Sequence, residues 1–282
     1  MRALAILSLG VAACACQRQT IVDDYQPEPE KPAVAMTRDF AIPVLMYHRV
    51  TDLSEREKRS PLLRDLSVAP KDFEAQVKYL KEQGYTFLKV SEIEEALRLG
   101  LELPVKAVAI TLDDGYRDNF TEAFPILEKY GAVATVFMVS DNFGRPQRLN
   151  PSEAKQMGAS TVQFQSHSKT HADLTAISLA QLQEELVTSK QVIEQNLGAV
   201  VTSIAYPAGA FNDRVEIACV EAGYLAAWKK GGGAVQPGHV VKAFQLPRVR
   251  IHGRTDMKKF KERVRSGVEI IAMRQSSRSR VM

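Results

Sequence analysis

From Ile42 onward the chain alternates short apolar runs with amphipathic stretches, and this alternation constrains the fold more than any other feature. Apolar, β-branched runs of this length suit strands that are buried on both faces. Seven such runs are expected to form strands: residues 43–47, 107–112, 133–139, 162–165, 201–206, 224–228 and 247–251. Their repeated alternation with helices implies right-handed crossovers and a parallel sheet. About seven units favour an α/β fold closed into a distorted (β/α) barrel, with an open doubly wound sheet as the alternative.

The helices between these runs have readable ends. Ser91 with Glu94, and Ser178 with Gln181, have the spacing of capping boxes, so a helix is predicted to begin at each serine. Gly100 and Gly198 are predicted to end these two helices. Core-facing stripes are expected at Leu182, Leu186, Ser189, Ile193 and Leu197, and at Phe73, Val77 and Leu80.

The first sixteen residues resemble a bacterial lipoprotein signal peptide. Arg2 precedes an apolar run over residues 3–13 that is too short to span a bilayer, and Cys14 follows as the expected site of lipidation. Lipidation would give firm membrane anchoring. Ala15, in place of Asp, implies the outer membrane facing the periplasm of a bacterial cell envelope. The alternative is an ordinary secretory signal with incidental cysteines.

The rest of the chain is expected to hold one folded domain. Residues 17–40 contain three prolines among polar residues and are predicted to be a flexible tether, residues 41–268 the domain, and residues 269–282 a basic tail. The net charge of +4, from 37 basic and 33 acidic residues, is too small to indicate nucleic acid as a partner. Cys219 is then the one cysteine of the domain and is expected in the core.

Polar residues follow two of the predicted strands. The run 107–112 leads directly into Asp113, Asp114 and Gly115, where the glycine lets the chain turn sharply. His167 and His171 follow the run 162–165. In a parallel barrel these strand ends meet on one face, and two histidines with one carboxylate suit a catalytic metal site with open positions. The competing interpretation is a turn with exposed acids and two surface histidines.

Residues 111–115 and 167–171 resemble the first two motifs of the polysaccharide deacetylase (NodB homology) family, carbohydrate esterase family four. Residues 43–48, 68–84 and 132–137 are similar to the branch of poly-β-1,6-N-acetylglucosamine deacetylases, and the resemblance covers roughly residues 42–262, a usual domain size. It implies that residues 41–268 form a hydrolase that removes N-acetyl groups from an extracellular N-acetylglucosamine polysaccharide.

The resemblance also implies roles for four residues. Asp113 is the expected general base, and Asp114, His167 and His171 are the expected ligands of a divalent metal ion. Zn²⁺ is the default for mixed nitrogen and oxygen ligands, and Co²⁺ or Ni²⁺ are alternatives. This division makes chemical sense, because an amide carbonyl needs a metal to polarise it and an unligated carboxylate to take a proton from the attacking water. Activity is therefore expected to fall on acidification.

The third motif departs from the family pattern. Residues 205–209 resemble it, with Tyr206 as a substrate contact beside a backbone N–H that holds the oxyanion. Many family members carry an arginine just before this motif, but residues 203–205 are Ser, Ile and Ala. How Asp113 is oriented is therefore left open.

Three further residues are candidates for the site. His252, after the run 247–251, resembles a late family histidine and is the first candidate for the general acid, whereas His48 competes as the acid or as a sugar contact. Trp228, the single tryptophan, is expected either to wall the acetyl pocket or to lie in the core.

Several functions are compatible with these motifs. The preferred substrate is a poly-β-1,6-N-acetylglucosamine of biofilms, with exopolysaccharide export machinery as a further partner and peptidoglycan or chitooligosaccharides as alternative substrates. A glycan-binding relative that has lost turnover is a second hypothesis. A third is a non-haem iron oxygenase, which would require an all-β scaffold.

Overall fold

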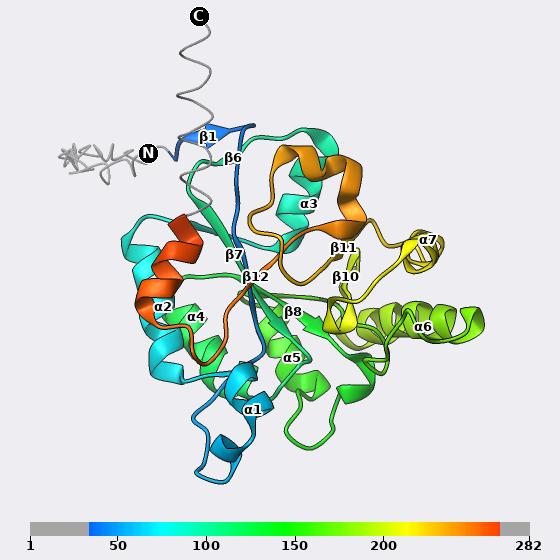
Figure 1. Ribbon diagram of the computed structural model, residues 1–282, viewed down its shortest axis with the longest axis horizontal. Coiled ribbons are helices and arrows are strands. Elements are labelled where there is room, and N and C mark those ends of the chain that lie inside the picture. Colours follow the sequence, from blue (N-terminus) through cyan, green and yellow to red (C-terminus); the bar gives the residue numbers. More distant parts are fainter. Residues whose placement is uncertain (1–33, 266–282) are drawn as a thin grey trace, which may run out of the picture. The chain divides into compact units, whose positions relative to one another are not determined.

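A computed structural model describes residues 34–265 of the chain (Figure 1). The predicted signal peptide with Cys14, most of the predicted tether and the basic tail 269–282 lie outside the described residues. The strands are β1 (Met36–Thr37), β2 (Val44–Tyr47), β3 (Arg49–Val50), β4 (Ser67–Val68), β5 (Thr86–Leu88), β6 (Leu103–Pro104), β7 (Ala107–Asp113), β8 (Ala134–Met138), β9 (Val162–Ser166), β10 (Ser203–Ala205), β11 (Ala226–Trp228) and β12 (Val249–Arg250).

The central sheet is parallel and strongly curled. Its strand order is β11-β10-β9-β8-β7-β2-β12, and β5 also pairs with β7. The two ends of this order approach each other through the segment before β12, because Leu246 forms a parallel bridge to Trp228 of β11 while Val249 pairs with Leu45 of β2. The predicted distorted (β/α) barrel is confirmed, and the all-β scaffold required by the oxygenase hypothesis is wrong.

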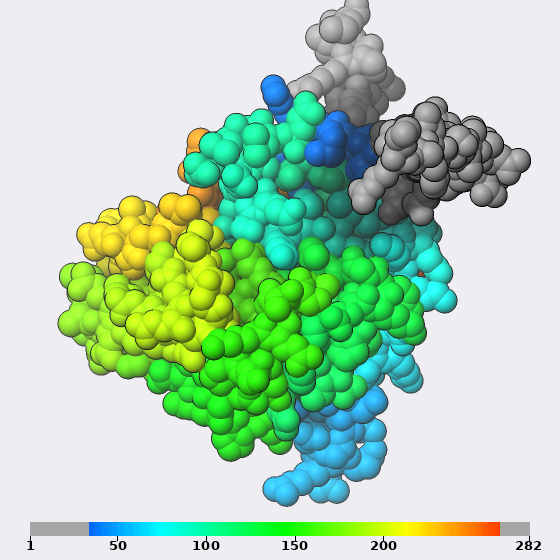
Figure 2. Space-filling view, turned by 180° about the vertical axis from the view of Figure 1, so that it is seen from behind, coloured from blue at the N-terminus to red at the C-terminus, as the bar shows by residue number. Residues whose placement is uncertain are grey.

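Helices surround the curled sheet (Figure 1), and the mid-chain helices, green in Figure 2, form a continuous outer surface on the far side. The α-helices are α1 (Pro61–Leu66), α2 (Pro70–Glu82), α3 (Val90–Leu99), α4 (Phe124–Tyr130), α5 (Pro151–Gly158), α6 (Leu179–Leu197) and α7 (Asp213–Glu221). Shorter helical segments are η1 (Glu57–Arg59), η2 (Asn119–Ala123), η3 (Ser140–Asn142), η4 (Pro207–Gly209) and η5 (Pro237–Gln245).

The core forms because the strands are apolar along their whole length. Every residue of β7 and β8 is buried, as expected for strands covered on both faces. The predicted helix stripes pack against them, with Phe73, Val77 and Leu80 of α2 fully buried. Cys219 is also buried, and burial raises the pKa of its thiol to about 12, so it is a core residue and no nucleophile.

Most predicted elements are present at nearly the predicted bounds. All seven predicted strands form, whereas β5, with three residues, carried too little pattern to be predicted. The helix predicted from Ser178 begins there, and its side chain accepts a hydrogen bond from Gln181 N. The capping box predicted at Ser91 is wrong, because the N-cap of α3 is Lys89, two residues earlier, and Lys89 N donates to Glu92 Oε2 over 2.7 Å.

The described chain begins beside the amino end of β7. Strand β1, which lies within the range predicted as a tether, pairs antiparallel with β6, so Met36 lies opposite Pro104. Within residues 34–265, none of the helices has the length and apolar character that crossing a bilayer requires.

Candidate active site

A pocket of about 350 Å³ lies at the carboxyl ends of the strands, where catalytic residues of parallel barrels are found. Several strands supply its lining from their carboxyl ends: β2 leads to His48, β7 ends in Asp113, β9 leads to His167 and β10 leads to Tyr206. Asp114 and His171 also line the pocket. Six of the eight site residues predicted from the sequence are therefore brought together.

Asp114, His167 and His171 can reach a common ion. One ligand atom of each lies within 4.8 Å of the others. The distance from Asp114 Oδ1 is 3.5 Å to His167 Nε2 and 3.6 Å to His171 Nε2. A divalent ion about 2.0–2.2 Å from each atom fits between donors at these separations.

The hydrogen bonds around these three residues leave their ligand atoms available. Asp114 Oδ1 is buried and has no hydrogen-bond partner among residues 34–265, which is costly unless a cation or another donor occupies the space beside it. His167 Nδ1 lies 2.7 Å from the carbonyl oxygen of Ala205, so it donates there and Nε2 remains an acceptor. Burial lowers the pKa of His167, which favours the neutral form that metal binding requires. The residues present therefore fit a divalent metal ion.

The histidine segment is held by helix α6. Glu185, a buried carboxylate on that helix, accepts hydrogen bonds from Lys169 N (2.9 Å), Thr170 N (2.8 Å) and Thr170 Oγ1 (2.6 Å). Ser168 Oγ accepts from His171 N over 3.0 Å. These contacts fix the backbone between the two histidines, so the segment that carries both rings is held in place independently of any ligand.

Unusual backbone conformations cluster at the pocket. Asp114, His171 and Ala208 all line it and all have positive φ angles, of 74°, 67° and 56°. Such conformations cost about 1 to 3 kcal/mol each in non-glycine residues and tend to gather at functional sites. Gly115 follows with φ 67°, and a Cβ there would lie 2.1 Å from Met138 Sδ, so the glycine is required.

Arg248 supplies the partner of Asp113 that the third motif lacks. Its Nη1 lies 2.7 Å from Asp113 Oδ1 and its Nη2 lies 2.9 Å from Oδ2, so the pair is bidentate. Both side chains are almost fully buried. Burial would raise the pKa of Asp113, but the Arg248 guanidinium, together with His167 and His48, outweighs this effect and the pKa falls to about 2. Asp113 is thus held ionised and oriented.

His48 and Tyr206 line the pocket in different ways. His48 is half-buried, and burial lowers the pKa of its ring while Asp113 and Asp114 oppose that shift. The Tyr206 hydroxyl donates to the Phe244 carbonyl over 2.9 Å, and the Tyr206 N–H donates to the Trp228 carbonyl over 3.0 Å. Tyr206 therefore forms part of the pocket wall, but its hydroxyl and its N–H already donate hydrogen bonds within the protein.

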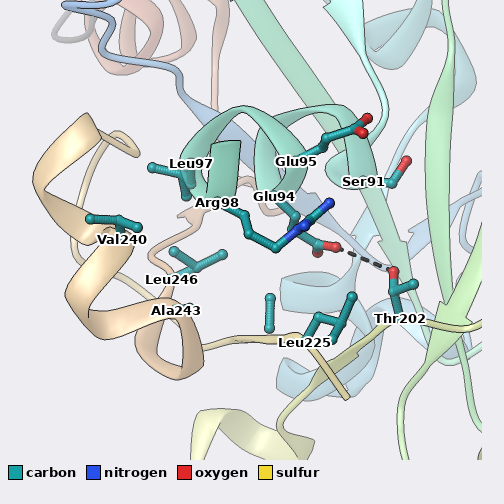
Figure 3. Close-up of a pocket in the computed structure, with 11 residues that line it drawn as sticks. Ser91, Glu94, Glu95, Leu97, Arg98, Thr202, Leu225, Val240, Ala243 and Leu246 are labelled. Atoms are coloured by element: carbon teal, nitrogen blue, oxygen red, sulfur yellow. Dashed lines mark hydrogen bonds between the residues drawn. The ribbon is translucent and has the colours of Figure 1, made fainter. Parts of the chain in front are cut away.

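Two predicted site residues lie elsewhere. His252 is not among the residues that line this pocket, and its Nδ1 accepts a hydrogen bond from Arg254 N over 3.2 Å. Trp228 is fully buried, and its indole N–H donates to Glu94 Oε1 over 2.7 Å. Figure 3 shows that Glu94 projects from α3 toward Thr202, in a separate pocket at the amino ends of β10 and β11.

Sequence reasoning missed the two residues that hold the site together. Arg248 lies within the predicted strand 247–251, which also contains Arg250, so the run offered two cations and no local signal showed which of them is buried against a partner. Glu185 follows Glu184 on an amphipathic helix, and the available signal was its position beside the predicted core-facing stripe, three residues after Leu182, whereas Glu184 lies on the opposite face.

This combination of fold and pocket is consistent with a hydrolase that has a site for a divalent ion. The family model described as polysaccharide deacetylase matches residues 101–227. The chain is 30% identical over 263 residues to the putative polysaccharide deacetylase YxkH of Bacillus subtilis, covering 86% of this chain and 89% of that protein. It is 26% identical to the poly-β-1,6-N-acetyl-D-glucosamine N-deacetylase of Staphylococcus aureus, covering 73% of this chain and 77% of that one.

A solved structure shows the same fold. The deacetylase PplD of Streptococcus pyogenes, in complex with acetate, superposes with a TM-score of 0.74 at 28% identity, covering 80% of this chain and 99% of that one. The chain belongs to the polysaccharide deacetylase family, and it is a hydrolase of the polysaccharide N-deacetylase class.

Proposed function

We propose that this enzyme removes acetyl groups from N-acetylglucosamine residues of a bacterial envelope polysaccharide, with Asp113 as general base and Asp114, His167 and His171 as metal ligands. The observation that carries this proposal is the unpartnered, buried Asp114 Oδ1 within 3.6 Å of two imidazole nitrogens, next to a second carboxylate that arginine holds. A divalent ion in that position would polarise the acetamide carbonyl and acidify water.

Asp113 acts on the attacking water. The Arg248 pair occupies one lone pair of each carboxylate oxygen and leaves the others free to accept a proton. Its low pKa keeps Asp113 ionised at neutral and mildly acidic pH, at the expense of basicity. Arg248 thus fixes the orientation of the Asp113 carboxylate, and with it the position of the lone pairs that can accept the proton.

His48 is our candidate for protonating the leaving amine. It lines the same pocket as Asp113 and Asp114, whereas His252 does not. His48 therefore lies where a general acid must be, close to the substrate. Asp113 and Asp114 favour its protonated form and oppose the effect of burial on its pKa. We therefore give the acid role to His48 in preference to His252.

The turn 207–209 offers one oxyanion donor. The N–H of Tyr206 donates to Trp228 O and that of Gly209 to Tyr206 O, while Pro207 has no N–H. This leaves Ala208, which lines the pocket, to face the developing negative charge with its N–H. The turn would then bind substrate through the Ala208 N–H, and Tyr206 through the shape of the pocket wall.

The substrate is either a poly-β-1,6-N-acetylglucosamine, on which the S. aureus relative acts by name, or an N-acetylated peptidoglycan glycan. A lipid on Cys14 would keep the enzyme at the outer membrane, where it meets such polymers and exopolysaccharide export machinery. Membrane fractionation of wild type and Cys14→Ala tests this location: both proteins in the soluble fraction would contradict it.

Acetate release from acetylated glucosamine oligomers tests the activity. We expect Asp113→Asn to lower kcat by about 10² to 10⁴ fold, the usual contribution of a general base. Metal content should stay unchanged, because Asp113 contacts Arg248 and is not one of the three ligands. No acetate from either protein would favour a glycan-binding relative without turnover, and equal rates would remove Asp113 as the base.

A further inference from the structure

The charges that line the active-site pocket are predominantly positive. Its two carboxylates, Asp113 and Asp114, face three cationic side chains, Lys230, Arg248 and Arg250, so the lining carries a net charge of +1 with neutral histidines. Arg248 neutralises Asp113, and Asp65, just outside the lining, pairs with Arg250. A divalent ion beside Asp114 would raise the net charge of the lining to +3.

Of the three cationic side chains that line the pocket, Lys230 is the one that takes part in neither of these two ion pairs. It is exposed, lines the pocket after β11, and forms no ion pair within residues 34–265. Its stem is positioned by the 207–209 turn, since a Cβ on Gly209 would lie 2.6 Å from Lys230 Cβ and 3.0 Å from Lys230 N. The backbone and Cβ of Lys230 are therefore fixed beside this turn, and its exposed side chain carries a charge that is available to a ligand.

Arg148 lies beside the pocket near Asp114. Its guanidinium carbon lies 3.8 Å from the centroid of the Tyr116 ring, which lines the pocket, and its Nη1 donates to the Asp114 carbonyl over 3.2 Å. Its charge also interacts with the Asp118 carboxylate, so Lys230 remains the cation on which the inference rests.

We propose that this site selects an acetylated glycan that carries an anionic group, a carboxylate or a phosphate, close to the N-acetylglucosamine residue that is deacetylated, and that Lys230 is the residue that senses it. The inference rests on the proposed deacetylase function and names its substrate class. A poly-N-acetylglucosamine chain is neutral and becomes cationic as amines are released, so the same field would repel it.

The experiment compares kcat/KM for acetate release from three substrates of similar length. These are neutral β-1,6-linked N-acetylglucosamine oligomers, peptidoglycan oligosaccharides bearing the lactyl carboxylate, and an acetylated glycan joined by phosphodiesters. We expect wild type to favour an anionic substrate by roughly tenfold at low salt, with the preference shrinking as ionic strength rises. Whichever anionic substrate leads identifies the source of the charge.

Lys230→Glu should lower the ratio of kcat/KM for the anionic substrate to kcat/KM for the neutral oligomers by roughly tenfold, mainly through KM for the anionic substrate. Lys71→Glu on α2, exposed and outside the pocket, changes the net charge equally and should alter neither rate. Equal kcat/KM on neutral and anionic substrates, or equal effects of both substitutions, would overturn the inference and leave the deacetylase intact. No acetate from any substrate would overturn the function itself.

Discussion

At the scale of single residues, the buried pair of Asp113 and Arg248 sets the chemistry of the site. The carboxylate is ionised because the guanidinium lies against both of its oxygens, and burial alone would have the opposite effect. We therefore expect any loss of activity on acidification to come from protonation of the metal-ligand histidine His167 rather than of the base. This modifies the expectation from sequence, in which the base and the histidines took up protons together.

Arg248→Met tests that arrangement. Without the guanidinium, the pKa of Asp113 should rise, so the acid limb of kcat/KM should move to higher pH. The free energy of unfolding at neutral pH should fall by about 3 kcal/mol, since one partner of a buried ion pair is removed. Because Asp113 has a lowered pKa when folded, this loss should be present above about pH 4 and should shrink as the pH falls toward 2.

Arg38→Met is the control for this measurement, because Arg38 pairs with Glu102 on the surface with 77% of its side chain exposed. Its stability and pH profile should match those of wild type. An unchanged acid limb in Arg248→Met would contradict the role given to this arginine.

At the scale of elements, helix α6 acts as the support of the metal-ligand segment. Glu185 accepts three hydrogen bonds from residues 169 and 170, which connect the two histidines. Glu185→Gln removes the negative charge and part of this acceptor capacity while preserving size. We expect metal affinity to fall by about 10- to 100-fold, the usual range for groups that orient ligands.

Glu184→Gln is a matched control one residue away, since the Glu184 side chain is 58% exposed and pairs with Lys169 Nζ. Metal titration of the two variants should separate them clearly. Equal metal affinities of the two variants would show that Glu185 of α6 does not influence metal binding.

The elements themselves differ in how far their sequence predicts them. Strand β7 is one apolar run ending in Asp113, so its position and its carboxylates could be predicted together. The contact between Asp113 and Arg248 spans 135 residues and depends on barrel closure through Leu246, which no local pattern records. The capping box expected at Ser91 failed because Lys89 and Glu92 offer the same spacing, and burial of Ile93 fixes the register.

At the scale of the whole molecule, the two ends of the barrel have different electrostatic roles. The carboxyl end carries the active site, whereas the amino end holds Glu94, whose carboxylate accepts from the Trp228 indole (Figure 3 shows Glu94 beside Thr202). Burial raises the pKa of Glu94. The folded state therefore holds its proton more tightly than the unfolded state, so this group's contribution to stability is fully present at low pH and is lost as pH rises through the folded pKa.

Glu94→Gln should remove this dependence. The amide oxygen can still accept from Trp228, so we expect the free energy of unfolding to match wild type in acid and to exceed it at neutral pH. Chemical denaturation across that range measures it, with the exposed Glu95→Gln on the same helix as control. A variant less stable than wild type at neutral pH would show that the Glu94 carboxylate is needed in its ionised form.

The proposed chemistry depends on one ion held by Asp114, His167 and His171. Metal analysis of the purified protein, coupled to acetate release, tests it directly in wild type and in Asp114→Asn, His167→Ala and His171→Ala. We predict one divalent ion per chain in wild type, little or none in the variants, and acetate release that disappears on chelation and returns when metal is added back. Acetate release that persists in metal-free wild type or in His167→Ala would contradict this dependence on the ion.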